Sequence, residues 1–389
     1  MRLCIAALAF LSACDEVREL AASRAERVAH PGVDLGPWML HPSSTSMTIA
    51  WTTRQAVAGE VRFGKHDLDQ TSTSGATTDH RAVLGDLEPA TRYRFQVEGH
   101  PPADGSFTTA PAPGASTAFT MAVYGDNRTN GGDHALVARA IAGENVSVAL
   151  HTGDMVVDAK DSRAWRHWFA EERDLLSHVP LVPTVGNHEL TDEGVAYSRW
   201  FQEPGRPGYH SFDYGPVHVA VLDSFEMAGG ATPAAGALSE AQRQWLLADV
   251  KAVARDRHLF VLVHQGPYAH PAKPRGPNHG GSLLVARALL DAALIHPVAA
   301  VFAGHEHFYE RGEIDGLRYF VVGGGGAPLE EPDAKFPGVQ SARKALSYVV
   351  LDVRGCQVAG RAKDIAGNVI DSFALGNCPA PPVVTEGAK

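Results

Sequence analysis

Five apolar runs in this chain end in residues of the kind that bind metal ions. Four of these runs end in glycine, and the residues that follow are Asp126, Asp154, Asn187–His188 and His305-Glu306-His307 in turn. A fifth run, LFVLVH, ends directly in His264. A strand that stops at such a point carries its last side chain to the rim of a sheet, and glycine there allows a sharp turn with positive φ. We therefore expect these side chains to converge on one place.

The expected set suits a pair of divalent first-row metal ions, because carboxylate, amide and imidazole groups are hard and borderline ligands. The six ligands are Asp126, Asp154, Asn187, His264, His305 and His307. Asp154 is the best candidate for a bridge, because a carboxylate has two oxygens and can hold two cations. Asp126 and His307 complete one side with it, and the other three residues complete the second side. Two such ions lower the pKa of a shared water and stabilise the charge that builds on a phosphoryl group during in-line attack.

These motifs, in this order, resemble the calcineurin-like metallophosphoesterase superfamily. The segments GHEHFYER (Gly304–Arg311) and YHSFDYGPVHVAVLDS (Tyr209–Ser224) are similar to the purple acid phosphatase branch, and the resemblance covers roughly Gly36 to Val353. It implies hydrolysis of a small phosphoester substrate by a metal-bound hydroxide. Phosphomonoesters are the first choice, because the resemblance is to acid phosphatases, and phosphodiester hydrolysis is the alternative. A non-catalytic surface binding protein that keeps the metals for structure is an alternative of another class.

The resemblance also assigns roles outside the ligand set. His188 follows a ligand, and we expect it to stabilise the transition state or to donate a proton. Arg128 could bind a phosphate oxygen through its planar fork, although an ordinary salt bridge is an open alternative. His279 lies in the loop after His264, where substrate-contacting residues occur in this branch. His151 and His218 lie within strand patterns, which favours core or supporting roles for both.

Two positions depart from the pattern of the family. The purple enzymes carry a tyrosine three residues after the second aspartate, and this chain has Val157 there. Other branches carry a histidine two residues after the first aspartate, where this chain has Arg128. Neither valine nor a protonated guanidinium binds a metal ion. We therefore expect the first metal ion to lack one protein ligand. The sequence leaves open whether the metal is manganese, zinc or iron. Without the tyrosine, the protein is expected to be colourless.

The residues from about 36 to 110 have the pattern of an all-β sandwich without a metal site. The run MTIAWTT alternates around Trp51, GEVRFG follows after a turn, and TRYRFQVEG alternates again. The segment around Tyr93 resembles the tyrosine corner of fibronectin type III domains and related sandwiches. We expect this domain to pack beside the catalytic domain or to space it.

Residues 117–355 alternate strands and helices after the linker Thr108–Thr117. The expected helices are Asp133–Glu144, Asp161–His178, Ser239–Ala254 with Ser239 as N-cap, and Gly281–Leu294. The late runs RYFVVGGG, SYVVLDV and QVAGRAK are strands without helices between them, which predicts a second sheet. The resemblance implies an α/β domain with four αββα layers, followed by a C-terminal strand segment and tail over residues 356–389.

The N-terminus predicts export and a lipid anchor. Residues 1–13 form a lipoprotein signal peptide that ends before Cys14, the residue expected to carry lipid, and residues 14–35 form a tether. This places the protein in the bacterial cell envelope, on the periplasmic side or the cell surface. Cys356 and Cys378 are expected to form a disulfide, with two buried thiols as the alternative. The net charge of −10 argues against broad nucleic-acid binding.

Overall fold

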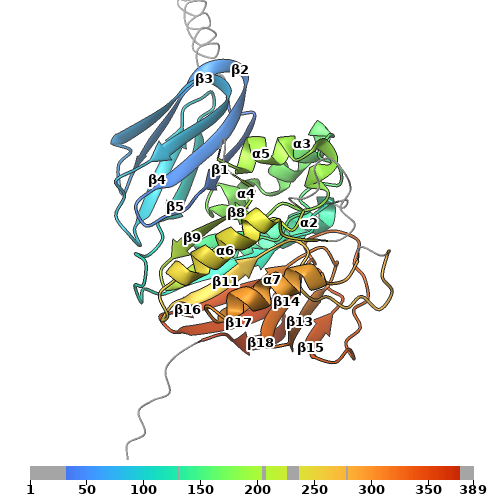
Figure 1. The fold of residues 1–389 in the computed structure, drawn as a ribbon. Coiled ribbons are helices and arrows are strands. Elements are labelled where there is room, and N and C mark those ends of the chain that lie inside the picture. Colours follow the sequence, from blue (N-terminus) through green and yellow to red (C-terminus); the bar gives the residue numbers. More distant parts are fainter. Residues whose placement is uncertain (1–31, 129–130, 204–206, 226–235, 277–278, 377–389) are drawn as a thin grey trace, which may run out of the picture.

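The computed structural model describes residues 32–128, 131–203, 207–225, 236–276 and 279–376 (Figure 1). The expected signal peptide over residues 1–13, Cys14 and most of the tether lie outside the described residues. Cys356 is disulfide-bonded, and its expected partner Cys378 also lies outside them. In the part of the chain that is described, no helix combines the length and the apolar character needed to cross a membrane.

The N-terminal domain is a sandwich-like arrangement of five strands. These are β1 (Leu35–Leu40), β2 (Met47–Gly64), β3 (Gln70–Leu84), β4 (Arg92–Val97) and β5 (Ala103–Thr108). The turn expected after Trp51 is absent, because β2 continues to Gly64 and only shifts its register against β3 between Thr52 and Gly59. The hydroxyl of Tyr93 accepts a hydrogen bond from the backbone N–H of Glu88 at 3.0 Å, which is the contact expected of a tyrosine corner.

Two sheets stack face to face in the rest of the chain (Figure 1). The six-stranded sheet contains β6 (Phe119–Tyr124), β7 (Val148–His151), β8 (Leu181–Pro183), β16 (Ser347–Arg354), β17 (Gln357–Asp364) and β18 (Val369–Ala374). The seven-stranded sheet contains β9 (His210–Tyr214), β10 (Val217–Val221), β11 (His258–Leu262), β12 (Val298–Ala303), β13 (Tyr309–Ile314), β14 (Leu317–Val322) and β15 (Val339–Arg343). Alternate apolar side chains such as Met121, Leu351 and Phe260 are fully buried between the sheets.

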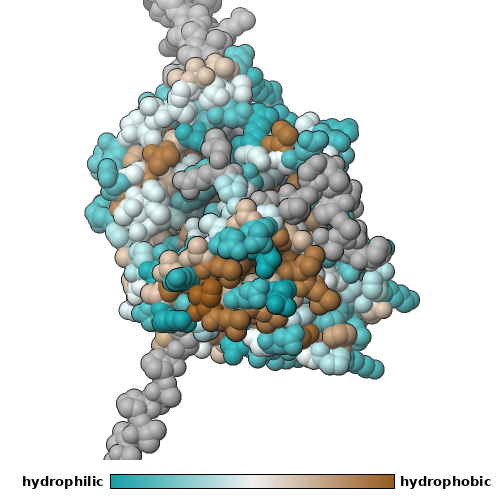
Figure 2. All heavy atoms as spheres, viewed as in Figure 1, coloured by the Kyte–Doolittle hydropathy of each residue, from teal (hydrophilic) through white to brown (hydrophobic). Residues whose placement is uncertain are grey.

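Helices cover the outer face of each sheet and complete the four αββα layers. The six-stranded sheet is covered by α2 (Gly131–Ala142), α3 (Ser162–Glu171), α4 (Arg173–Leu176) and α5 (Val195–Phe201), and the seven-stranded sheet by α6 (Glu240–Ala252) and α7 (Leu283–Ala293). The side chain of Ser239 accepts from the backbone N–H of Gln242, so Ser239 is the N-cap of α6 as expected. Figure 2 shows apolar side chains gathered over α7, where Leu283, Leu284 and Leu294 are exposed.

Two predictions about this domain are wrong in detail. The helix expected over residues 161–178 is divided at Glu172, whose ψ of −5° departs from helical geometry. The late strands do not form a sheet of their own. Strand β14 pairs in parallel with β12 in the seven-stranded sheet, whereas β16 pairs antiparallel with β6 in the six-stranded sheet. An alternating pattern indicates that a segment is a strand, but it does not indicate which sheet the strand joins.

Strand β1 connects the sandwich-like domain with the αββα domain. Met39 points into the core of the sandwich-like domain, whereas Trp38 belongs to the cluster beneath the helices α3 and α5. The ring of Trp38 lies 4.7 Å from that of Phe169, and its Nε1–H donates to the carbonyl of Trp200 at 3.3 Å. Buried aromatic contacts of this kind are among the larger contributions to a domain interface.

Candidate metal centre

All five ligand-bearing segments follow the carboxyl ends of strands. Asp126 comes two residues after β6, Asp154 three after β7, Asn187 four after β8, His264 two after β11 and His305 two after β12. Strands β6, β7 and β8 are parallel to one another, and so are β11 and β12. The carboxyl ends of parallel strands lie at one edge of a sheet, which is where ligand sites form in such folds. The two stacked sheets therefore bring the five segments to one edge of the domain.

The glycines at these strand ends make room, and the ligands themselves take the unusual backbone conformation. Asp126, Asp154 and His305 have φ of 59°, 56° and 71°, in the left-handed region that only a few non-glycine residues adopt. A Cβ atom on Gly304 would lie 2.2 Å from Asp126 Oδ2, and one on Gly186 would lie 2.3 Å from Asp154 Oδ1. The positive φ that glycine allows is used at Gly153, where φ is 94°, whereas Gly186 and Gly304 allow the close approach of neighbouring atoms. Strained ligands held by their surroundings are typical of functional sites.

One group of donor atoms is assembled around Asn187. Its Oδ1 atom lies 3.2 Å from His264 Nε2 and 3.0 Å from His305 Nδ1, and those two nitrogens are 3.3 Å apart. Asp154 Oδ1 lies 3.3 Å from His264 Nε2. Donors bound to one ion at about 2.1 Å lie about 3.0–3.4 Å apart in octahedral or tetrahedral geometry. The spacing of these four atoms therefore fits a single transition-metal ion.

The protonation of His264 also suits this role. The backbone carbonyl of Thr152 accepts the Nδ1 proton of His264 at 2.7 Å, which leaves the Nε2 lone pair directed at the other donors. Such an outer hydrogen bond fixes the tautomer of a ligating histidine. Burial lowers the pKa of His264, so the ring is neutral, as ligation requires.

The other group contains Asp126 and His307. Asp126 Oδ1 lies 3.7 Å from His307 Nε2, and the backbone N–H of His305 donates to both oxygens of Asp126 at 2.9 and 3.1 Å. Burial, together with the neighbouring Asp154, raises the pKa of Asp126 well above its usual range. Two buried carboxylates side by side repel each other, and a cation between them removes that cost. The donor set of this group thus also fits a metal ion, with Asp154 between the two groups.

Arg128 lies inside the ligand set. Its Nε–H donates to Asp154 Oδ2 at 3.0 Å, and its Nη2–H donates to His307 Nε2 at 3.0 Å. The side chain is only 13% exposed. Of the two roles expected for Arg128, the structure shows the salt bridge, and it is made to Asp154, one of the predicted ligands.

His188 and His279 lie at the edge of the centre. His188 donates its Nδ1 proton to the carbonyl of Val157 at 2.6 Å, and its Nε2 atom lies 3.9 Å from Asp154 Oδ2. His279 stacks on His305, with ring centroids 5.0 Å apart, and its Nδ1 atom lies 3.0 Å from Glu306 Oε1. Val157 therefore supports His188 through its backbone, although its side chain cannot ligate.

Glu189 is a buried supporting residue whose role the sequence did not reveal. Its carboxylate accepts hydrogen bonds from the backbone N–H groups of Gly186, Asp154 and Met155 at 2.8, 2.9 and 2.8 Å. It thus ties the loop after β8 to the loop after β7. Burial, followed by the repulsion of Asp154, raises the pKa of Glu189 to about 8. Its place directly after the Gly-Asn-His run was the signal that could have identified it.

The two strand histidines have different roles. His151 is buried, accepts from the backbone N–H of Gly153 at 3.1 Å, and contacts Asn127 through its other nitrogen. It supports the turns that carry Asp126 and Asp154 without facing the donor atoms. His218 lies between Asp213 and Asp249 at 2.8 and 2.9 Å.

A pocket of about 310 Å³ opens beside Arg128. Its wall includes Arg128, Met155, Val157, His167 and Trp168. It therefore borders the candidate centre on the side where His188 contacts Val157.

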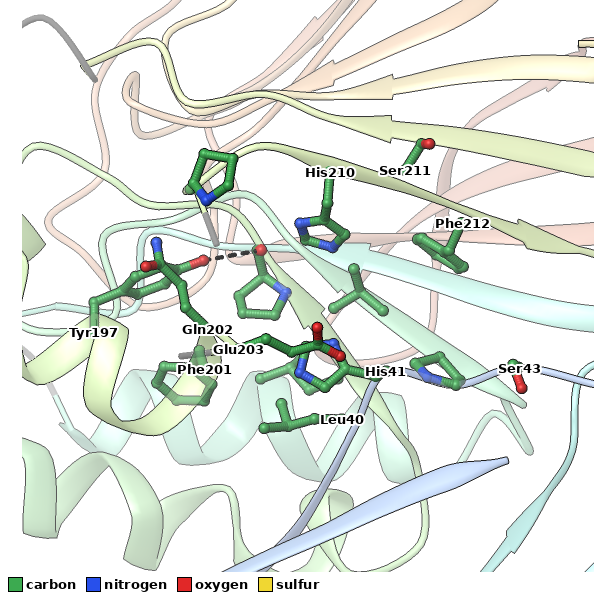
Figure 3. A pocket seen from close by; sticks show the side chains of 16 residues that line it. Leu40, His41, Ser43, Tyr197, Phe201, Gln202, Glu203, His210, Ser211 and Phe212 are labelled. Carbon is green, nitrogen blue, oxygen red and sulfur yellow. Dashed lines mark hydrogen bonds between the residues drawn. The ribbon is translucent and has the colours of Figure 1, made fainter. Parts of the chain in front are cut away.

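A separate pocket of about 200 Å³ lies where the two domains meet (Figure 3). Leu40, Tyr197, Phe201 and Phe212 form much of its apolar wall, and the hydroxyl of Tyr197 donates to the carbonyl of Pro183 at 3.0 Å. The wall contains none of the six expected ligands. This pocket is thus distinct from the candidate centre.

Comparison with known proteins agrees with the fold. Residues 119–309 match the calcineurin-like phosphoesterase family. Purple acid phosphatase 21 of Arabidopsis thaliana is 27% identical over 340 residues, which cover 77% of this chain and 74% of that protein. A second relative from the same plant, Fe(3+)-Zn(2+) purple acid phosphatase 12, is 23% identical over 279 residues, and this chain spans only 57% of its length.

The structure of purple acid phosphatase PPD1 from yellow lupin (Lupinus luteus) seeds has the same fold. It superimposes with a TM-score of 0.74 at 17% identity, over 90% of this chain and 77% of that one. The expected sandwich-like domain followed by an αββα domain is confirmed by this likeness. The chain carries a calcineurin-like phosphoesterase domain, and over most of its length it is similar to the purple acid phosphatases.

Proposed function

We propose that this chain is a metal-dependent hydrolase of small phosphoesters, with phosphomonoesters as the preferred class. The observation that carries the proposal is the meeting of six predicted ligands around Asp154, with spacings that fit metal binding. The similarity to purple acid phosphatases supports the choice of monoesters. When bound, two metal ions supply an activated water and neutralise charge on the phosphate group.

The protein's own side chains would divide the remaining work. Asp154 would hold both metal ions, because its Oδ1 lies beside His264 and its Oδ2 faces Arg128 and the first group. His188, with its Nδ1 proton committed to the Val157 carbonyl, presents Nε2 to the substrate and donates a proton to the leaving oxygen. His279, held by Glu306 against His305, contacts a phosphate oxygen. The name of the Fe(3+)-Zn(2+) relative supports iron or zinc at the centre, with manganese as the third candidate.

The test of this proposal is a comparison of two substrates with the same leaving group. The purified full chain would be loaded separately with manganese, zinc and iron and assayed on p-nitrophenyl phosphate and bis(p-nitrophenyl) phosphate. We expect faster hydrolysis of the monoester with at least one metal. Faster hydrolysis of the diester would make the protein a phosphodiesterase. Failure on both substrates with every metal would contradict the hydrolase proposal and favour a binding protein.

We further propose that the protein is exported and anchored through lipid on Cys14, with residues 36–110 as a fibronectin III-like module beside the enzyme. The apolar run before Cys14 supports this. Cys14→Ser should move the protein from the membrane fraction to the soluble fraction of cells. If the variant stays with membranes to the same extent as the wild type, the anchor proposal is wrong.

A further inference from the structure

We propose that the guanidinium of Arg128 competes with the first metal ion for two donor atoms, so that the two metal positions fill at widely different metal concentrations. The inference rests on the proposed function, because it concerns the same centre. It adds to the proposed function that an arginine of this chain controls how the metal ions bind. The guanidinium of that arginine cannot itself bind a metal ion.

The contacts of Arg128 are those that a cation at the first position would make. Its Nε and Nη2 atoms each lie 3.0 Å from a donor, Asp154 Oδ2 and His307 Nε2 respectively. The backbone of Arg128 is held in place as well, because its N–H donates to the carbonyl of Asp154 at 3.3 Å. Arginine stays protonated in proteins, so a permanent positive charge lies between two ligands.

The hydrogen bond to His307 and ligation by His307 exclude each other. His307 Nδ1 lies 2.9 Å from the carbonyl of Pro328, which accepts its proton. The ring therefore has one lone pair left, on Nε2, and Arg128 donates to it. A metal ion needs the same lone pair, so it can bind His307 only after Arg128 has moved away.

At the second position the arginine to consider is Arg275. The nearby Arg275 donates to the backbone carbonyl of His305 at 2.8 Å and pairs with Glu330 at 2.5 Å. Neither contact uses a donor atom of His264, His305 or Asn187. The second position should therefore fill first, with Arg128 still bound to Asp154 and His307.

Arg128 has space to move into when the first ion arrives. It lines the 310 Å³ pocket together with Val157 and Met155, so its side chain can turn outward from the ligands. In that position its planar fork is free to bind phosphate oxygens. Loading of the first position would thus release a substrate-binding group.

The experiment is a manganese titration of the metal-free full chain by calorimetry, with bound metal counted after equilibrium dialysis. For the wild type we expect two binding steps with dissociation constants about 100-fold apart, since two charge-assisted hydrogen bonds must break for the weaker step. Arg128→Met should reduce this gap to a few-fold by strengthening the weaker step. Arg128→Lys should give an intermediate gap, because one ammonium group cannot reach both donors equally.

Arg275→Met is the matched control, since it removes the same charge near the centre without touching a donor atom, and it should keep the wide gap. Thermal melting of each variant would show that it is folded. Equal affinities in the wild type, or an unchanged gap in Arg128→Met, would overturn the competition. Absence of metal binding in every variant would instead overturn the proposed function itself.

Discussion

At the scale of single residues, the sequence predicted which side chains meet at one place, but it did not predict the contacts of Arg128. A glycine next to a predicted ligand marks the end of a strand. Six metal-binding side chains at such strand ends can be brought together in only a few ways. The direction of the Arg128 side chain depends on the lone pairs of Asp154 and His307, which belong to distant segments. No local pattern encodes such a contact.

Val157 at the position of the tyrosine in purple enzymes leads to a spectroscopic prediction. The hydroxyl groups of eight of the nine tyrosines bond to groups outside the ligand set, and the ring of the ninth, Tyr209, packs on Trp245. The iron-loaded protein should therefore lack a visible tyrosinate-to-iron charge-transfer band. An intense band in its absorption spectrum, lost on reduction, would contradict this.

His188 should matter for turnover and little for metal binding. Its imidazole contacts the Val157 carbonyl, and Nε2 remains 3.9 Å from the nearest oxygen of Asp154. His188→Asn should lower kcat by about 100-fold or more, as expected for loss of a general acid, with unchanged metal content. His167→Asn changes a histidine in the neighbouring pocket and is the comparison variant. Equal kcat for His188→Asn and wild type would remove His188 from the proposed chemistry.

At the scale of elements, the sequence predicted whether most segments are helices or strands, but it did not predict which strands pair with each other. The caps and apolar spacing of α6 gave its position, because those signals are local. The pairing of β16 with β6 joins residues more than two hundred positions apart, and the length of β2 depends on register shifts against β3. Such pairings are decided by which faces can be buried together.

The tight packing of the strand-end turns predicts that a single methyl group will disturb the centre. In Gly304→Ala the new Cβ would lie 2.2 Å from Asp126 Oδ2, so the carboxylate must move. The variant should lose about 1–3 kcal/mol of stability, the usual cost of overpacking, and bind manganese more weakly. Gly85→Ala is the control, since no atom lies within 4 Å of its Cβ. Wild-type affinity in Gly304→Ala would refute the role assigned to this glycine.

A histidine between two carboxylates predicts how the stability of the fold depends on pH. Burial disfavours the protonated form of His218 on β10, but Asp213 and Asp249 outweigh it and raise the pKa of His218 to about 9. The folded state therefore holds this proton more tightly than the unfolded state, whose histidines have a pKa near 6.5. The resulting stability, roughly 3 kcal/mol, is complete below pH 6.5 and is lost as the pH rises through 9.

The check on His218 is chemical denaturation at several pH values between 6 and 10. His218→Gln should be less stable than the wild type at pH 6 and should lose less stability as the pH rises. His66 is exposed between β2 and β3 and offers a control as His66→Gln. Parallel pH profiles for His218→Gln and wild type would contradict the assignment.

At the scale of the whole molecule, the order of the two domains was predicted, and packing of the sandwich beside the catalytic domain was one of two expectations, but the residues of the contact were not predicted. The structure shows that the segment Leu35–Leu40 is strand β1 and that its last four residues are buried on both faces. Met39 packs inside the sandwich-like domain and Trp38 inside the catalytic domain. This shared strand explains how a domain without any expected ligand holds a fixed position beside the catalytic domain.

The central claim of the account is that the strand-end residues hold metal ions on which phosphoester hydrolysis depends. Asp154 tests it most directly, because its two oxygens face both donor groups. Metal content and p-nitrophenyl phosphate hydrolysis would be measured together for the wild type and Asp154→Asn, with thermal melting as a check on folding. We predict that the variant retains less metal and loses at least about 100-fold in kcat. A folded Asp154→Asn protein with wild-type metal content and activity would contradict the account.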